Sequence, residues 1–351
     1  MNLLKLLLFI QVFSSSSPIY TIGELYDLFI DFDVNPTNEI NPLQLCDKVT
    51  DFYASPEGKL IDVLVSSLIH IPNQSRYIAE GGFGKVYKIN YNNEPAAVKI
   101  INRAKAGDLI KTELFYWIDM YVNYPEDAVE FKFCLYDNTY YYLVSELMDG
   151  DLTTVLDDFS SAFDMKQQLK MLYRMQTTLA HIQKLRIVHH DIKPENFLIR
   201  YRNPDDYDLK IADFGLAEER MEENSVVGTE LFLPPEAFQG QFSFKNKRGD
   251  TWAMGMTFLN LYMDEIELAD PCYKVQYTAK CHKKLMDKIT AFFSTNFGLK
   301  DRTNPITKCY EAQNVMEVIK LMLSYFAVDR PKPDDVLKKL EYLAGKARLL
   351  V

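Results

Sequence analysis

Four charged or amide residues that lie close together in this chain could carry out a specific chemistry. Asp191 is followed by Lys193 and Asn196, and a stretch long enough for a short hairpin leads to Asp213, the first residue of a DFG tripeptide. Such a set can hold a divalent metal on a nucleoside triphosphate while one carboxylate takes the proton of an attacking hydroxyl. The spacing therefore indicates phosphoryl transfer.

A glycine-rich turn lies upstream, between two strand-like runs. It reads AEGGFGKV and begins at Ala79. Glycines lack a Cβ, so backbone N–H groups can approach and cover phosphates. The candidate phosphate-covering residues are Ala79, Gly81, Gly82 and Gly84. Such turns are often plain hairpins, but the strand-turn-strand context favours this nucleotide loop over the Rossmann type, which needs a helix next.

A lysine and a glutamate follow at positions that fit the same chemistry. Lys99 lies in the third strand-like run, the second after the glycine-rich turn, and Glu113 lies in the helix predicted next. A lysine on that strand can reach the α- and β-phosphates and be held by a carboxylate from the helix. Glu126 and Glu130 are weaker candidates for this carboxylate, because both lie beyond a helix stop at Pro125.

Two later segments complete the pattern. Residues 228–236 read GTELFLPPE, and residues 250–255 read DTWAMG. Together with VHHDIKPEN at 188–196 and the upstream signatures, they resemble the eukaryotic protein kinase superfamily over about residues 76–345. Ala79 departs from that family's pattern, which has glycine there, and Pro234 replaces the usual alanine.

The resemblance implies an α+β chain with a bilobal protein kinase fold. The small N-lobe (74–146) would be β-rich with one helix, and the larger C-lobe (147–345) would be α-helical. The residue pattern agrees, because short Tyr-, Val- and Ile-rich runs precede Gly150 and helical periodicity follows it. The predicted strands cover 76–79, 85–90, 96–101, 131–136 and 140–145, and the predicted helix covers 108–121.

The resemblance also implies roles for the catalytic residues, with ATP and Mg²⁺ as cofactors. Asp191 would receive or orient the proton of the substrate hydroxyl, and Lys193 would neutralise charge on the transferred phosphoryl group. Asn196 and Asp213 would bind metal. Thr229 stands where Ser/Thr kinases place a hydroxyl against the catalytic Asp and Lys.

The adenine would be bound by a hinge and by apolar side chains. The resemblance places the hinge at Glu146 to Met148, with backbone groups of Leu147 or Met148 facing the base. Val86, Ala97 and Leu198 match the family's adenine-lining positions. Ser145 falls at the gatekeeper position, where its small size implies an open pocket behind the adenine.

Two structural contacts are expected from the same resemblance. Glu236 would form a buried ion pair with Arg330, nearly a hundred residues later, and this pair would anchor the preceding segment. Asp250 would brace the backbone of the catalytic loop from a central helix of the larger lobe.

The residues around Asp191 also indicate a kinase class. Lys193 is the form seen in Ser/Thr kinases rather than in Tyr kinases. His190 stands where most kinases carry an arginine that grips a phosphorylated activation segment. Because histidine lacks that permanent charge and its forked geometry, we expect a non-RD kinase whose activity does not depend on phosphorylation there.

Two other functions are open to a chain of this pattern. A pseudokinase or nucleotide-binding scaffold would keep the fold and lose a catalytic role, but Lys99, Glu113, Asp191, Asn196 and Asp213 are all present. A small-molecule kinase is disfavoured by the complete segment from Thr229 to Glu236, which builds a platform for protein substrates.

Charge gives a weaker indication of partners. The net charge of −10 argues against a nucleic-acid surface. Asp149, Asp151 and Glu195 lie where some Ser/Thr kinases read basic residues that flank the target hydroxyl. A solvated acidic rim explains them equally well.

The N-terminal segment is unusual for an ATP-dependent enzyme. Residues 1–17 combine a lysine, an apolar run and four serines, which resembles a secretory signal, and a buried or frayed amphipathic helix is the alternative. A genuine signal would place the protein in the secretory pathway or outside the cell; otherwise it would be cytoplasmic. No apolar run is long enough for a transmembrane span. Residues 18–73 are predicted to form a helical extension of unknown role.

Overall fold

The chain divides between Met148 and Asp149 into two compact units in the computed structural model. The signal-like segment 1–17 and the extension 18–73 lie outside the described residues. No helix within the described parts of the chain combines the length and apolar character needed to cross a membrane. The described residues are 77–81, 84–91, 94–106, 109–136, 140–154, 165–203, 206–217, 228–238, 247–261, 279–295 and 310–346.

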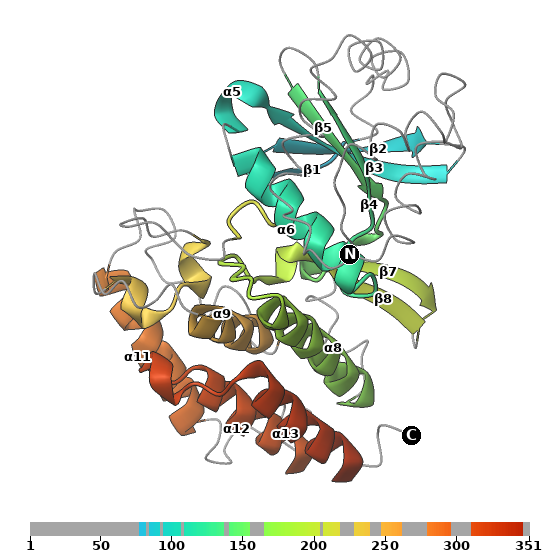
Figure 1. Ribbon diagram of the computed structural model, residues 1–351. Coiled ribbons are helices and arrows are strands. Elements are labelled where there is room, and N and C mark those ends of the chain that lie inside the picture. The colour runs from blue at the N-terminus through green and yellow to red at the C-terminus, as the bar shows by residue number, and fades with distance from the viewer. Residues whose placement is uncertain are drawn as a thin grey trace, which may run out of the picture. The chain divides into compact units, whose positions relative to one another are not determined.

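The first unit is built on a five-stranded antiparallel sheet with the strand order β1-β2-β3-β5-β4 (Figure 1). The strands are β1 (Tyr77–Gly81), β2 (Gly84–Tyr91), β3 (Glu94–Asn102), β4 (Phe131–Tyr136) and β5 (Tyr140–Glu146). They confirm the strands predicted from aromatic and β-branched runs, whose side chains pack well on a pleated surface. Strand β3 lies between β2 and β5, so Ala96 and Val98 are buried.

Among the described residues of this unit, two helices accompany the sheet. The short helix α5 (Arg103–Ala106) precedes α6 (Leu109–Asn123), which matches the predicted helix and ends just before Pro125. Trp117 of α6 donates a hydrogen bond from Nε1 to the carbonyl of Val129 at 2.8 Å, and its ring meets Phe131 edge-on at 5.2 Å. These contacts attach α6 to β4, which fixes the helix that carries Glu113.

The second unit is mainly helical. Its helices are α8 (Met165–Lys184), α9 (Lys247–Asn260), α11 (Ala279–Thr295), α12 (Tyr310–Met322) and α13 (Pro333–Lys346). Helix α9 packs against α8 and α12, and every residue from Asp250 to Asn260 is buried. A Cβ added at Gly255 would lie 2.9 Å from Cβ of Met322, so this glycine allows the two helices to approach closely. The DTWAMG segment therefore forms the predicted central helix.

A small sheet in the second unit follows the catalytic loop. It has the order β6-β7-β8, with β6 (Gly150–Asp151), β7 (Phe197–Asn203) and β8 (Asp206–Ile211). The hairpin β7–β8 occupies the interval between Asn196 and Asp213 and returns the chain beside its own start, because Ala212 donates to the carbonyl of Asn196 at 2.9 Å. The described part of this unit also contains the 3₁₀ turns η2 (Pro194–Asn196), η3 (Glu230–Phe232), η4 (Pro235–Phe238) and η8 (Ala327–Asp329).

Helix α8 ends in a capped turn that leads into the catalytic loop. Ile187 donates to the carbonyl of Ile182 and Arg186 donates to that of Gln183, both at 3.1 Å. This pair of bonds is the Schellman motif, whose C′ residue takes the left-handed conformation. Here that residue is Arg186, with φ of 64°. The turn thus uses a residue with a Cβ where glycine is usual.

Candidate active site

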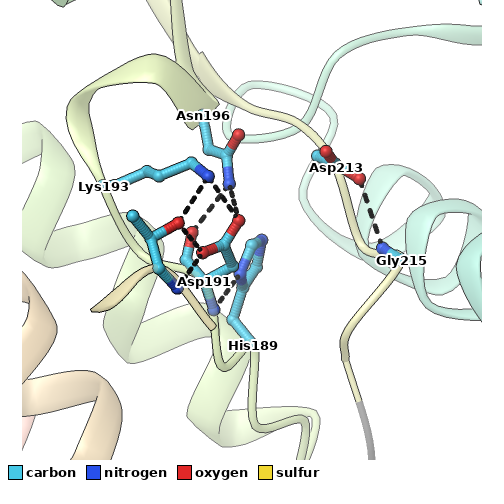
Figure 2. A network of polar contacts seen from close by, with 7 residues as sticks. His189, Asp191, Lys193, Asn196, Asp213 and Gly215 are labelled. Atoms are coloured by element: carbon cyan, nitrogen blue, oxygen red, sulfur yellow. Dashed lines mark hydrogen bonds and ion pairs between the residues drawn. The ribbon is translucent and has the colours of Figure 1, made fainter. Parts of the chain in front are cut away.

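The carboxylate of Asp191 lies at the centre of a polar network (Figure 2). Its Oδ1 accepts from the backbone N–H of Thr229 at 3.0 Å and from the Thr229 hydroxyl at 2.7 Å. Its Oδ2 lies 2.7 Å from Nζ of Lys193 and accepts from the amide of Asn196 at 3.1 Å. Lys193 also donates to the Thr229 hydroxyl at 2.7 Å. The structure thus brings together three predicted site residues and the hydroxyl expected beside them.

The backbone around Asp191 is held by a buried carboxylate. Oδ2 and Oδ1 of Asp250 accept the backbone N–H groups of His189 and His190 at 2.8 and 2.9 Å, which confirms the expected bracing contact. Burial raises the pKa of Asp250 to about 6, although the two N–H groups and Lys247 favour its charged form. His190 has φ of 65°, so a residue with a side chain is held in the left-handed region.

Gly228 fits closely against the catalytic loop. It has φ of 114°, and a Cβ added there would lie 2.5 Å from the carbonyl oxygen of His190. Only glycine satisfies both conditions without strain. Sequence reasoning treated this glycine only as part of a motif, since its contact with a loop far away in the sequence leaves no local signal.

His189 is fully buried and structural. Its Nδ1 accepts the backbone N–H of Asp191 at 3.3 Å, and its ring lies 5.0 Å from that of Phe214. Burial lowers the pKa of His189, against the opposing effect of Asp191 and Asp213. A neutral imidazole suits this place, because Nδ1 must keep its lone pair to accept a hydrogen bond.

Asp213 follows strand β8 and has a left-handed backbone. Its φ is 61°, and its Oδ1 accepts from the backbone N–H of Gly215 at 3.4 Å. Figure 2 shows this carboxylate in a separate position from the Asp191 network, on the chain that leaves β8. Asn196 uses its amide nitrogen on the carbonyl and Oδ2 of Asp191, at 2.7 and 3.1 Å. If Asn196 binds a metal as predicted, its amide oxygen is therefore the donor atom.

The predicted ion pair between Glu236 and Arg330 is present and buried. Nη1 and Nη2 of Arg330 each donate to one oxygen of Glu236 at 2.6 Å. The remaining guanidinium donors reach backbone carbonyls of Ser324, Arg248 and Tyr325 at 2.9, 3.1 and 3.1 Å. All five N–H groups of the guanidinium thus have acceptors, which is what a buried arginine requires.

In the first unit, Lys99 and Glu113 form the predicted pair. Nζ of Lys99 lies 2.6 Å from Oε1 of Glu113, and the glutamate side chain is only 4% exposed. A charge-assisted hydrogen bond of this length fixes the ammonium at one point. Val86 lies opposite Lys99 on β2 and is half-buried.

The glycine-rich turn joins β1 and β2. Ala79 is opposite Val86, and Gly81 is opposite Gly84, while Gly82 lies outside the described residues. A Cβ added at Gly84 would collide with the carbonyl oxygen of Ile100. Glycine at position 84 is therefore required for the packing of β2 on β3, and this requirement is independent of phosphate binding.

The hinge residues lie at the end of β5. Glu146 is turned toward β4, because its Oε1 accepts the backbone N–H of Glu130 at 2.8 Å. Ser145 and Ala97 are paired across β5 and β3 and both are buried, which leaves two small side chains side by side. Met148 is buried as well. In the second unit, Leu198 is half-buried on β7.

Two of the three acidic residues considered for substrate recognition have structural roles. Oδ2 of Asp149 accepts the backbone N–H of Tyr201 at 2.8 Å. Oδ1 of Asp151 accepts the N–H groups of Thr153 and Thr154 at 2.9 and 3.3 Å, as an N-cap residue does. Glu195 is exposed.

The predicted site residues therefore form two sets, one in each unit. Lys99 and Glu113 belong to the first unit, and Asp191, Lys193, Asn196 and Asp213 belong to the second. The convergence of both sets on one nucleotide stays a prediction.

Comparison with known proteins agrees with this geometry. Residues 73–341 match the family model of the protein kinase domain. The chain is 25% identical over 283 residues to a probable serine/threonine-protein kinase of Dictyostelium discoideum, covering 76% of this chain and 60% of that protein. It is 27% identical over 195 residues to calcium-dependent protein kinase 4 of Plasmodium berghei, covering 52% of this chain and 35% of that protein.

A further relative matches a shorter stretch. The chain is 32% identical over 133 residues to the serine/threonine-protein kinase ksp1 of Schizosaccharomyces pombe, covering 36% of this chain and 28% of that protein. The chain thus spans between about a quarter and three fifths of the length of these relatives.

Proposed function

Because the chain belongs to the protein kinase domain family, we propose that it is an active protein serine/threonine kinase. It would transfer the γ-phosphoryl group of ATP to a Ser or Thr hydroxyl of a protein substrate. The observation that carries this proposal is the convergence of Lys193, Asn196 and Thr229 on the carboxylate of Asp191, at 2.7 to 3.1 Å.

The chain's own side chains would divide the work. Asp191 would orient the substrate hydroxyl and receive its proton, because its carboxylate is held in one orientation by donors on both oxygens. Lys193 would stabilise charge on the phosphoryl oxygens. Lys99, fixed by Glu113, would position the phosphates of the nucleotide.

The residues present fit a magnesium ion. The amide oxygen of Asn196 and the carboxylate of Asp213 are hard oxygen donors, which Mg²⁺ prefers. When bound, the metal supplies positive charge against the triphosphate.

Serine and threonine are the proposed acceptors because Lys193 bonds the hydroxyl of Thr229 beside Asp191. Phosphoamino-acid analysis of labelled substrate tests this, and labelled phosphotyrosine would contradict it. We also propose that a preference for basic flanks depends chiefly on Glu195, since Asp149 and Asp151 hold the fold. A peptide array that favours acidic flanks would reject that preference.

Activity would not require phosphorylation of the segment before Gly228. His190 replaces the arginine that would bind such a phosphate, and its backbone is instead fixed by Asp250. Treatment with a phosphatase, or the substitution Ser225→Ala outside the described residues, should leave the rate within about threefold of the untreated enzyme, as expected where no charge-assisted contact is lost. Loss of most activity would contradict this proposal.

The decisive experiment compares the chain with Asp191→Asn. Purified protein is incubated with labelled ATP, Mg²⁺ and a mixture of Ser/Thr substrates, and ATP binding is measured in parallel. We expect transfer by the wild type, a loss of at least about a hundredfold in Asp191→Asn, and unchanged ATP binding in both. Equal labelling by both proteins would reject catalysis. ATP binding without transfer by the wild type would identify a nucleotide-binding scaffold instead.

A further inference from the structure

The segment that carries Asp191 is attached to the first turn of α9 at two places. At its start, Nε2 of Gln183 donates to the carbonyl of Lys247 at 2.7 Å, and Nζ of Lys247 donates to the carbonyl of Gln183 at 2.6 Å. At its end, the N–H groups of His189 and His190 donate to Asp250. Two attachments on one rigid helical turn define where the intervening chain lies.

Both attachments lie beside a left-handed backbone conformation. Arg186, with φ of 64°, donates its N–H to the same Gln183 carbonyl that accepts from Lys247. His190, with φ of 65°, is itself one of the residues bound by Asp250. Strained conformations of non-glycine residues persist only where surrounding contacts hold them. The reciprocal pair of Gln183 and Lys247 adds to the helix-end hydrogen bonds that hold the first of the two.

The surroundings of the Lys247 ammonium act on its charge in opposite directions. The pKa of Lys247 is lowered first by burial and then by the nearby Arg186, while Asp250 opposes the shift. The ammonium bonds a carbonyl at the end of α8, and it attracts the Asp250 carboxylate that braces the loop. Loss of the lysine side chain would remove its hydrogen bond to the Gln183 carbonyl and its attraction to Asp250.

We propose that Gln183 and Lys247 are positioning residues, whose reciprocal hydrogen bonds hold the segment from Arg186 to Asp191 in its reactive geometry. Neither side chain is among those assigned to the reacting groups. They act through the loop backbone, so their loss should affect the orientation of the Asp191 carboxylate rather than nucleotide binding. The catalytic part of this inference rests on the proposed kinase function.

The test uses the full chain with Lys247→Met, Gln183→Leu and the double variant. Lys247→Arg keeps a donor in the same place and serves as the rescue. Lys339→Met, at an exposed position on α13, is the matched control for loss of a lysine. For each protein, amide hydrogen exchange of the peptide containing residues 187–192, thermal unfolding, kcat and KM for ATP are measured.

Lys247→Met and Gln183→Leu should each speed exchange at residues 187–192 and lower kcat about tenfold, with KM for ATP within about twofold of wild type, because small misplacement of a catalytic group costs rate. The double variant should be more impaired than either single one, since each substitution removes a different hydrogen bond of the pair and leaves the backbone carbonyl that accepts the other. Lys247→Arg should recover most of the rate, and Lys339→Met should match wild type.

A merely structural contact gives a different result. Unchanged exchange at 187–192, or a fall in melting temperature with kcat preserved, would overturn the inference. A double variant with wild-type exchange at these residues would overturn it too. If the wild type transfers no phosphate, the proposed function fails, and the exchange measurement alone still decides whether the pair holds the segment.

Discussion

At the scale of single residues, the site is defined by how many hydrogen bonds one carboxylate receives. Asp191 accepts from Thr229 through one oxygen and from Lys193 and Asn196 through the other. The Thr229 hydroxyl both donates to Asp191 and accepts from Lys193. The Thr229 hydroxyl therefore contacts the Asp191 carboxylate and the Lys193 ammonium in the same way that an attacking substrate hydroxyl would have to.

Thr229→Val should lower kcat and destabilise the protein by about 1–2 kcal/mol, because removing a bridging hydroxyl leaves two charged groups with one partner fewer. Thr229→Ser keeps the hydroxyl and should stay within about threefold of wild type in rate. Steady-state kinetics and urea unfolding of both variants provide the measurement. If the serine variant is as impaired as the valine variant, the hydroxyl has no such role.

At the scale of secondary-structure elements, short sequence patterns predicted the strands and helix ends that depend on neighbouring residues. Aromatic and β-branched runs predicted all five strands of the first sheet, and Pro125 marked the end of α6. The end of α8 gave no comparable signal, because Arg186 occupies the C′ position where glycine usually marks a helix stop. The Gln183–Lys247 pair was also out of reach, since it joins residues separated by 64 positions.

Arg186→Gly should stabilise the protein by about 1 kcal/mol and raise its melting temperature by about 2–4 °C, because glycine adopts the left-handed conformation without steric cost. Arg186→Ala is the matched control, since it removes the same charge but keeps the Cβ. Thermal and chemical unfolding measure both. A gain in the alanine variant equal to that in glycine would assign the effect to charge and contradict the backbone explanation.

At the scale of the whole molecule, the resemblance predicted the fold class and two long-range contacts. The pair of Glu236 and Arg330 and the bracing by Asp250 were both expected from motifs and are both present. The pKa shifts of buried groups were not predictable from the sequence, because they depend on which side chains are enclosed after folding. Burial raises the pKa of Asp250 to about 6 and lowers that of His282 to about 4.

These two groups should oppose each other in the pH dependence of stability. His282 has an ordinary pKa of 6.5 and a folded value of about 4, so the unfolded chain binds its proton first and stability falls as the pH drops between those values. Asp250 has an ordinary pKa of 3.8 and a folded value of about 6, so the folded chain binds its proton first. Its contribution to stability therefore rises as the pH drops from about 6 to 3.8. Buried His189, whose pKa is also lowered, acts in the same direction as His282.

His282→Phe keeps the ring that stacks on Phe238 at 4.5 Å and removes the proton-binding site. Its stability relative to wild type should therefore improve as the pH falls from 7 to 5. Asp250→Asn should change the relative stability in the opposite direction. Urea unfolding at several pH values measures both, and curves parallel to wild type for the histidine variant would show that His282 does not control the response.

The guanidinium of Arg330 links the end of the chain to its catalytic segment. Its donors serve Glu236, Arg248, Ser324 and Tyr325, which belong to separate stretches of the sequence. A lysine offers three donors on a single nitrogen and could not reach this set. Truncation before residue 330 would therefore strand the negatively charged Glu236 in the interior, beside the stretch that presents Thr229.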